Sequence, residues 1–217
     1  FLRYRGLTEK LNPDVVIRFG RWPTSKVLGE LLGLSRNKQH ILVTEGDWND
    51  SFQLATNVLQ YDPVSFCKGL ASVGPKLSVT SNWLAQWRLL SNATQDSIQG
   101  YMDRTKEMFE GKVLYEVSKL IPNGSILFVG NSMPVRDMES FLPNSPGNIN
   151  VMANRGASGI DGVLSTALGS GVGAQVPVTL ILGDISFFHD ANGLLMAKSQ
   201  DLNATVIVLN NDGGGIF

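Results

Sequence analysis

The stretches "VTLILGD" at residues 178–184 and "TVIVLNNDGGG" at residues 205–215 decide the fold class. Each begins with a run of apolar, largely β-branched residues that has the length of a buried strand. Each run then passes directly into glycine and side chains with oxygen donors. Residues 126–129 behave in the same way and lead into "GNS" at residues 130–132. The pattern predicts a sheet whose strands end in small and polar residues.

Helical patterns alternate with these strands along the second half of the chain. Strands are expected at residues 126–129, 149–152, 178–182 and 205–209, and helices at residues 134–141, 162–174 and 192–199. This alternation requires crossover connections and therefore parallel pairing. We predict a doubly wound parallel sheet, with ligands bound outside the carboxyl ends of its strands.

The first part of the chain has a similar α/β pattern. Strands are expected at residues 15–19, 41–44 and 64–67, and a helix at residues 25–34. A helix-forming passage at residues 83–121, with a break at Gly111, separates the two parts. We therefore expect two domains, residues 1–95 and 96–217, with a linker near residues 93–111.

Composition limits the classes of function. The 217 residues carry 18 Lys and Arg against 19 Asp and Glu, without a basic block suited to nucleic acid. A single cysteine, Cys67, permits no internal disulfide, and no Cys/His spacing indicates zinc. Every apolar run in the sequence is much shorter than the about 20 residues that a membrane-spanning helix requires. Cys67 is expected to be buried as a small apolar residue, and His40 to face solvent.

Asp184 and Asn211 are the most informative pair. Their spacing accommodates one crossover, which would bring both to the same edge of the sheet. A carboxylate, an amide oxygen and the carbonyl of Gly213 form half of a shell for Mg²⁺, which phosphate oxygens and water usually complete. Gly213 and Gly214 can bring backbone N–H groups against phosphate. The pattern predicts a magnesium–diphosphate site.

Gly183-Asp184 followed by Asn210-Asn211 resembles the thiamine diphosphate motif, although Ile185 stands where Gly is usual. Two further stretches, "GNSMPVRD" (130–137) and "NRGASGIDGVLSTALG" (154–169), resemble the MenD family. Its members are the 2-succinyl-5-enolpyruvyl-6-hydroxy-3-cyclohexene-1-carboxylate synthases of menaquinone and phylloquinone biosynthesis. "RFGRWPTSK" (18–26) and "GDISFFHDANGLL" (183–195) fit the same family.

The resemblance implies roles for individual residues. Asp184, Asn211 and the Gly213 carbonyl match Mg²⁺ ligands; Gly183 and Gly214 belong to the cofactor-binding segment. Ile160 matches the apolar residue that supports the bent cofactor. The remaining matches contact the reacting centre or the substrate carboxylates: Ile216, Phe217, Lys26, Ser132, Arg136 and Arg155.

The resemblance also implies the reaction. These transferases decarboxylate 2-oxoglutarate on thiamine diphosphate and add the succinyl carbanion equivalent to isochorismate. They are homodimers or homotetramers, located in bacterial cytoplasm or in chloroplasts. The catalytic glutamate comes from a pyrimidine-binding domain with no counterpart in this chain. The resemblance places residues 1–95 in the central domain and residues 96–217 in the first half of the diphosphate-binding domain. We therefore expect a fragment with a truncated second domain, inactive alone and poorly behaved as a monomer.

Two alternatives remain open. Another thiamine enzyme, such as a decarboxylase or acetolactate synthase, would act on pyruvate and would not need Arg136 and Arg155. A non-catalytic α/β module would bind an adenine nucleotide or nothing, but the glycine-rich turn of dinucleotide-binding folds is not found.

Overall fold

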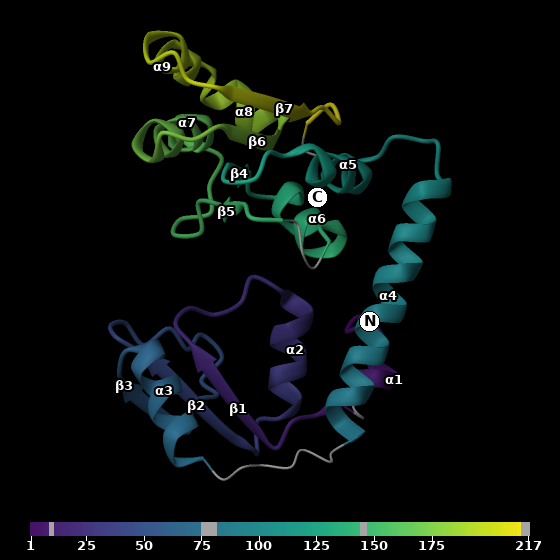
Figure 1. Ribbon diagram of the computed structural model, residues 1–217, viewed down its shortest axis with the longest axis vertical. Helices are drawn as coiled ribbons and strands as arrows, with labels where there is room; N and C mark the ends of the chain where they lie inside the picture. The colour runs from purple at the N-terminus through teal and green to yellow at the C-terminus, as the bar shows by residue number, and fades with distance from the viewer. Residues whose placement is uncertain (9–10, 75–81, 144–146, 214–217) are drawn as a thin grey trace. The chain divides into compact units, whose positions relative to one another are not determined.

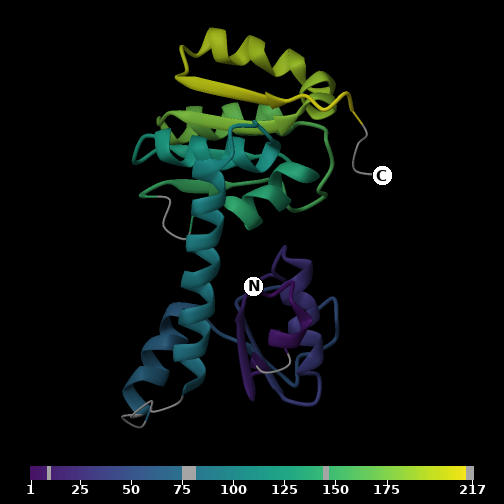
Figure 2. The same cartoon turned by 90° about the vertical axis from the view of Figure 1, so that its right-hand side faces the viewer.

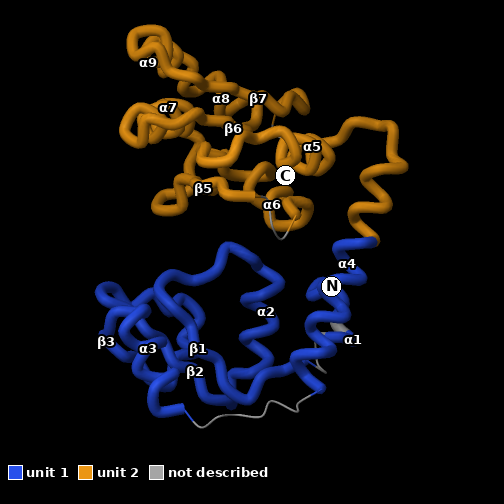
Figure 3. The backbone as a smooth tube through the Cα atoms, in the orientation of Figure 1, with its two compact units in different colours: residues 1–96 blue, residues 97–217 orange. Residues whose placement is uncertain are grey.

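The computed structural model describes residues 1–8, 11–74, 82–143 and 147–213. It divides into two compact units, Phe1–Asp96 and Ser97–Phe217, coloured separately in Figure 3. Both units combine helices with a parallel sheet. Within the described segments, every helix is too short or too polar to cross a lipid bilayer.

The first unit contains a parallel sheet in the order β1-β2-β3. Its elements are α1 (Arg5–Thr8), β1 (Val15–Phe19), α2 (Lys26–Leu34), β2 (Gln39–Thr44), β3 (Asn57–Gln60) and α3 (Pro63–Val73), followed by α4 (Asn82–Arg104), within which the two units divide. The central strand β2 supplies Leu42 and Val43 to the core, and α2 supplies Leu31 and Leu32. The Ser25 side chain caps α2 by accepting a hydrogen bond from the backbone N–H of Leu28.

The strand predicted at residues 64–67 is wrong, because these residues lie in α3. Asp62 accepts hydrogen bonds from the backbone N–H groups of Val64 and Ser65, and Pro63 occupies the first turn. An Asp-Pro pair of this kind starts a helix, since the carboxylate caps it and proline needs no hydrogen bond there. The third strand is instead β3.

The helix break predicted at Gly111 is also misplaced. The described chain leaves helical geometry at residues 105–109, and Gly111 lies in the first turn of α5 (Glu110–Leu120). A Cβ atom at Gly111 would overlap the ring of Phe141. This glycine therefore permits close packing of two helices and does not end one.

The second unit contains a parallel sheet in the order β5-β4-β6-β7 (Figure 1). After α5 come β4 (Ile126–Val129), α6 (Met133–Phe141), β5 (Asn150–Met152), α7 (Val163–Ala174), β6 (Val178–Gly183), α8 (Asp184–His189), the 3₁₀ turn η2 (Ala191–Gly193), α9 (Leu194–Ser199) and β7 (Ala204–Leu209). Figure 2 shows β6 and β7 side by side and pointing in the same direction. The predicted doubly wound sheet is confirmed.

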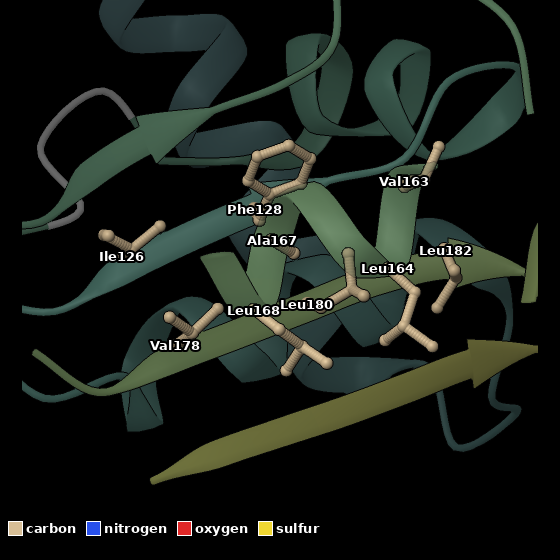
Figure 4. Packing of buried hydrophobic residues seen from close by; sticks show 9 residues of the cluster. All are labelled: Ile126, Phe128, Val163, Leu164, Ala167, Leu168, Val178, Leu180 and Leu182. Atoms are coloured by element: carbon tan, nitrogen blue, oxygen red, sulfur yellow. The ribbon is translucent and has the colours of Figure 1, made fainter. Parts of the chain in front are cut away.

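Alternating side chains of this sheet enter two cores. Ile126 and Phe128 of β4 pack with Leu180 of β6 against α7, as Figure 4 shows, with α8 and α9 contributing at the margin. Leu127 and Val129 face the other way, toward α5 and α6. Burial of each such side chain contributes about 1.5–3 kcal/mol. Apolar residues at consecutive strand positions are thus explained by helices on both faces.

The strand order of this sheet reverses between β4 and β6. From β4 the chain crosses to β5 on one side, and from β6 it crosses to β7 on the other. The loops after β4 and β6 therefore diverge, which is where open α/β sheets bind ligands. Those loops contain residues 130–132 and the junction of Gly183 with Asp184.

Two minor expectations are wrong. His40 is buried in β2, where its Nε2 lies 2.9 Å from the carbonyl oxygen of Ser35 and 3.1 Å from Ser35 Oγ. Cys67 is exposed on α3. Both errors follow from the element assignments: β2 begins at Gln39, so His40 lies inside the strand, and α3, which carries Cys67, buries none of its residues.

Candidate functional site

Asp184 and Gly213 come together at the carboxyl ends of β6 and β7. Gly183 pairs with Leu209 in the last register position, so the segments that follow leave the sheet side by side. A Cβ atom at Gly213 would lie 3.8 Å from Asp184 Oδ2 and 2.8 Å from Ile185 Cδ1. Gly213 has φ +71°, a conformation that glycine adopts without strain. The backbone thus passes next to the Asp184 carboxylate.

Asp184 is also the first residue of α8, where the sequence predicted a loop. A carboxylate at the first turn is favourable because it faces the partial positive charge of the helix amino end. Ile185, which departs from the usual motif, is exposed and lies next to Gly213.

Asn211 is oriented by a partner that the sequence did not reveal. Its Nδ2 donates a 2.8 Å hydrogen bond to Oε1 of Glu110 at the start of α5. Since the amide nitrogen is directed at Glu110, the amide oxygen points elsewhere and can serve a cation. An open cleft of about 640 Å³ adjoins this pair, lined by α5, α6 and the end of β7. The two residues are 101 positions apart, so no local pattern connects them.

The loop after β4 is held tightly against β6. The Gly130 N–H donates a 2.7 Å hydrogen bond to the Ile181 carbonyl, and a Cβ atom at Gly130 would lie 2.9 Å from Leu182 Cβ. Asn131 follows with a buried side chain, and Ser132 is exposed. Ser132 has φ 70° and ψ −126°, a strained conformation for a residue with a side chain. Such strain is found most often at functional sites.

Arg155 and Ile160 belong to the loop between β5 and α7, which is anchored at two points. Arg155 Nη1 donates a 2.8 Å hydrogen bond to Asn131 Oδ1, and Asn131 Nδ2 donates a 2.7 Å hydrogen bond to the Gly159 carbonyl. Ser186 Oγ of α8 donates a 3.1 Å hydrogen bond to the Ile160 carbonyl. The Ile160 residue remains 37% exposed, available to an apolar ligand surface.

Arg136 and Lys26 are less constrained. Arg136 is exposed in the first half of α6, and its guanidinium has no hydrogen bond or ion pair to any residue that the structure describes. Lys26, in the first unit, begins α2 with a 90% exposed side chain 3.9 Å from the Glu30 carboxylate. Both cations are accessible to an anionic ligand.

Asp190 has a structural role that sequence analysis missed. Gly162 precedes α7 and has no side chain to cap it. Asp190, which lies outside α7, provides the cap instead. Its carboxylate accepts hydrogen bonds from the backbone N–H of Ser165 at 2.7 Å and from the Ser165 hydroxyl at 2.8 Å. The carboxylate ties the segment after α8 to the start of α7, next to the loop that carries Ile160.

The donor set suits a hard cation. Among the described residues, no three His, Cys, Asp or Glu side chains gather into a metal site. A cation at Asp184 would therefore draw on amide and carbonyl oxygens, which Asn211 and Gly213 offer, and on a ligand such as phosphate. Three predicted site residues, Gly214, Ile216 and Phe217, lie outside the described residues.

Known proteins resemble the chain in sequence and in fold. Residues 139–217 match the family described as "Thiamine pyrophosphate enzyme, C-terminal TPP binding domain". The chain is 42% identical over 218 residues to a 2-succinyl-5-enolpyruvyl-6-hydroxy-3-cyclohexene-1-carboxylate synthase of Bacillus cytotoxicus. It is 44% identical over 216 residues to one of Geobacillus kaustophilus. Both alignments cover 100% of this chain and 37% of the relative.

The chain belongs to this synthase family. The chain spans about 37% of the length of the Bacillus and Geobacillus synthases. A solved Mycobacterium smegmatis protein assigned to the thiamin diphosphate-dependent enzymes has the same fold, with a TM-score of 0.60 and 16% identity. That match covers 91% of this chain and 38% of the other.

Proposed function

We propose that the protein containing this chain is a transferase of menaquinone or phylloquinone biosynthesis that uses thiamine diphosphate and Mg²⁺. It decarboxylates 2-oxoglutarate and joins the remaining four-carbon unit to isochorismate. The observation that carries the proposal is the approach of Gly213 to the Asp184 carboxylate where β6 and β7 end. The names of the similar synthases support the choice of reaction.

In this proposal, Mg²⁺ is held by the Asp184 carboxylate, the Asn211 amide oxygen and the Gly213 carbonyl. Gly183 and Gly214 leave room for the diphosphate to approach the backbone. Ile160 and Ile216 provide apolar support for the cofactor and exclude water. When bound, thiamine diphosphate would supply a cationic ring that accepts the electron pair left by the departing carboxylate.

The substrates are both dianions, so their binding requires fixed cations. Arg155 and Arg136 present planar guanidinium groups that can bind a carboxylate through two hydrogen bonds. Ser132 adds a hydroxyl at the end of β4, and Lys26 is a further cation proposed to bind a substrate carboxylate. Phe217 would close the apolar wall of the site.

The remaining assignments are part of the same proposal. Residues 1–95 correspond to the central domain of the synthase, and residues 96–217 to part of its diphosphate-binding domain. A glutamate outside this chain would activate the cofactor. The working protein would be a homodimer or homotetramer.

The test is calorimetric titration of thiamine diphosphate with Mg²⁺ into the 217-residue chain and into the product of the complete reading frame that encodes it. Asp184→Asn should weaken Mg²⁺-dependent binding more than about 100-fold, because removing one partner of a close charge pair costs about 3–5 kcal/mol. Asp201→Asn is the matched control: it neutralises an exposed carboxylate just before β7, at the opposite end of the sheet. Asn also tolerates the positive φ of Asp201.

Measuring which 2-oxo acid is consumed then identifies the kind of thiamine enzyme. The full product should consume 2-oxoglutarate in the presence of isochorismate and leave pyruvate unreacted. Preference for pyruvate would indicate another thiamine enzyme. Absence of Mg²⁺-dependent cofactor binding in both proteins would contradict the proposed function.

A further inference from the structure

Asn131 is an unusual side chain for its position at the rim of the second sheet. It is 5% exposed, whereas its neighbour Ser132 is exposed. Burying an amide costs free energy unless its polar groups find partners. Here both do: the oxygen accepts from Arg155 and the nitrogen donates to the Gly159 carbonyl.

The backbone that carries Asn131 is fixed relative to the predicted cofactor site. Val129 pairs with Ile181 at the end of the β4–β6 ladder, and the Gly130 N–H extends that pairing with its bond to the Ile181 carbonyl. Gly130 lacks space for a Cβ atom against Leu182. The same strand β6 ends in Gly183, next to Asp184. The backbone of Asn131 therefore follows directly on a segment that is held in place against β6 at this edge of the sheet.

Arg155, in contrast, is an exposed residue on a loop. Its described hydrogen bond uses Nη1, which leaves the rest of the guanidinium available to a carboxylate. A free arginine side chain loses much rotational freedom on binding a ligand, and a side chain that is already oriented loses less.

We propose that Asn131 is a positioning residue: it acts through Arg155, holding the guanidinium in the orientation that receives a carboxylate of an acidic substrate. Its second bond, to Gly159, fixes the other end of the same loop close to Ile160. This inference rests on the proposed function and adds the element that orients its substrate-binding arginine.

A double-mutant cycle on the product of the complete reading frame tests the inference. Asn131→Ala should raise KM for 2-oxoglutarate or isochorismate about 10- to 100-fold, the scale of a lost hydrogen bond to a charged group, with a much smaller change in kcat. In an Arg155→Ala background the same substitution should add less than about 2-fold, because Asn131 then has no guanidinium to orient.

Two further variants separate positioning from general stability. Asn131→Asp keeps an oxygen for Arg155 but adds a negative charge beside the guanidinium and loses the donor to Gly159, so its KM should rise at least as much as that of Asn131→Ala, and this rise should also disappear in the Arg155→Ala background. Ser186→Ala removes the other anchor of the loop and leaves the Asn131–Arg155 bond in place, so KM should change less than about 3-fold. Thiamine diphosphate affinity should stay within about 2-fold in all of these variants.

The inference would be overturned if Asn131→Ala raised KM by the same factor in the unmodified protein and in the Arg155→Ala background. A loss of cofactor affinity as large as the rise in KM would also overturn it. The proposed function fails separately, through absent cofactor binding in the unmodified protein. In that event, the same cycle is measured by calorimetry with 2-oxoglutarate and with isochorismate. Non-additive losses of affinity would support the role of Asn131, and additive losses or no binding would refute it.

Discussion

The two sheets of this chain end in similar polar residues but use them differently. At the end of β1, Arg18 donates from Nη1 to the Asn49 carbonyl at 2.6 Å and from Nη2 to Asp50 Oδ1 at 3.0 Å. Its guanidinium also lies 4.8 Å from the ring centroid of Trp22, and its side chain is only 12% exposed. Arg155, on the loop that follows β5 of the second sheet, is exposed apart from its bond to Asn131. An enclosed cation stabilises the fold, whereas an open one is available to a ligand.

The largest expected effect comes from Arg18. Arg18→Met should destabilise the first unit by about 3 kcal/mol, because it leaves the Asp50 carboxylate and the Asn49 carbonyl without their partner. Burial lowers the pKa of Arg18 and Asp50 opposes that shift, so the charge persists at neutral pH. Hydrogen exchange measured by mass spectrometry would localise the loss to β1 and residues 47–55.

Arg155→Met is the matched control, since it removes the same charge from the second unit. Its expected cost in stability is about 1 kcal/mol, because Arg155 is exposed and only the Asn131 amide oxygen loses its partner. Equal losses from the two substitutions would contradict the distinction between enclosed and open cations.

A smaller effect is expected within one motif of the second unit. Asp190→Ala should lower the free energy of unfolding by about 1–2 kcal/mol, because α7 loses the carboxylate that caps Ser165. Asp184→Ala, six residues earlier, should cost less stability and instead remove cofactor binding. Thermal unfolding combined with cofactor titration checks both variants; a larger stability loss for Asp184→Ala would show that the two roles are reversed.

Sequence reasoning succeeded where periodicity and connection rules apply. The runs at residues 126–129 and 178–182 were identified as strands because helices on both faces make consecutive positions apolar. The parallel pairing of β6 with β7 was predicted in the same way, since one crossover returns the chain to the same edge of the sheet. The motifs were sufficient to predict the family.

The failures involve contacts that no local pattern encodes. Glu110 and Asn211 are 101 positions apart in the sequence and are in contact in the folded second unit. Asn131 was read as one of several small polar residues after a strand, because burial at the rim depends on the loop from β5 folding over it. The helix at Pro63 was missed for a different reason: its apolar run was weighted above the Asp-Pro pair that starts it.

The smallest effect returns to the first unit, where Asp62 caps α3 much as Asp190 caps α7. The hydrogen bonds from Ser65, followed by that from Val64, lower the pKa of Asp62 below its usual range. Because the folded pKa is depressed, the stabilisation of α3 is present above the unfolded pKa of about 3.9 and is lost as pH falls through the folded pKa. The expected loss is smaller than for Asp190→Ala, since α3 buries none of its residues.

The amide proton resonances of Val64 and Ser65 report this titration directly in NMR spectra recorded from pH 6 to pH 2. We expect a transition with a midpoint below about 3.9. Asp62→Asn keeps one side-chain oxygen, which can accept the shorter hydrogen bond from Ser65, and cannot titrate, so the two resonances should lack the transition. If the variant showed the same transition, another acidic group would be responsible. The cap of α3 would then have no pH dependence of its own.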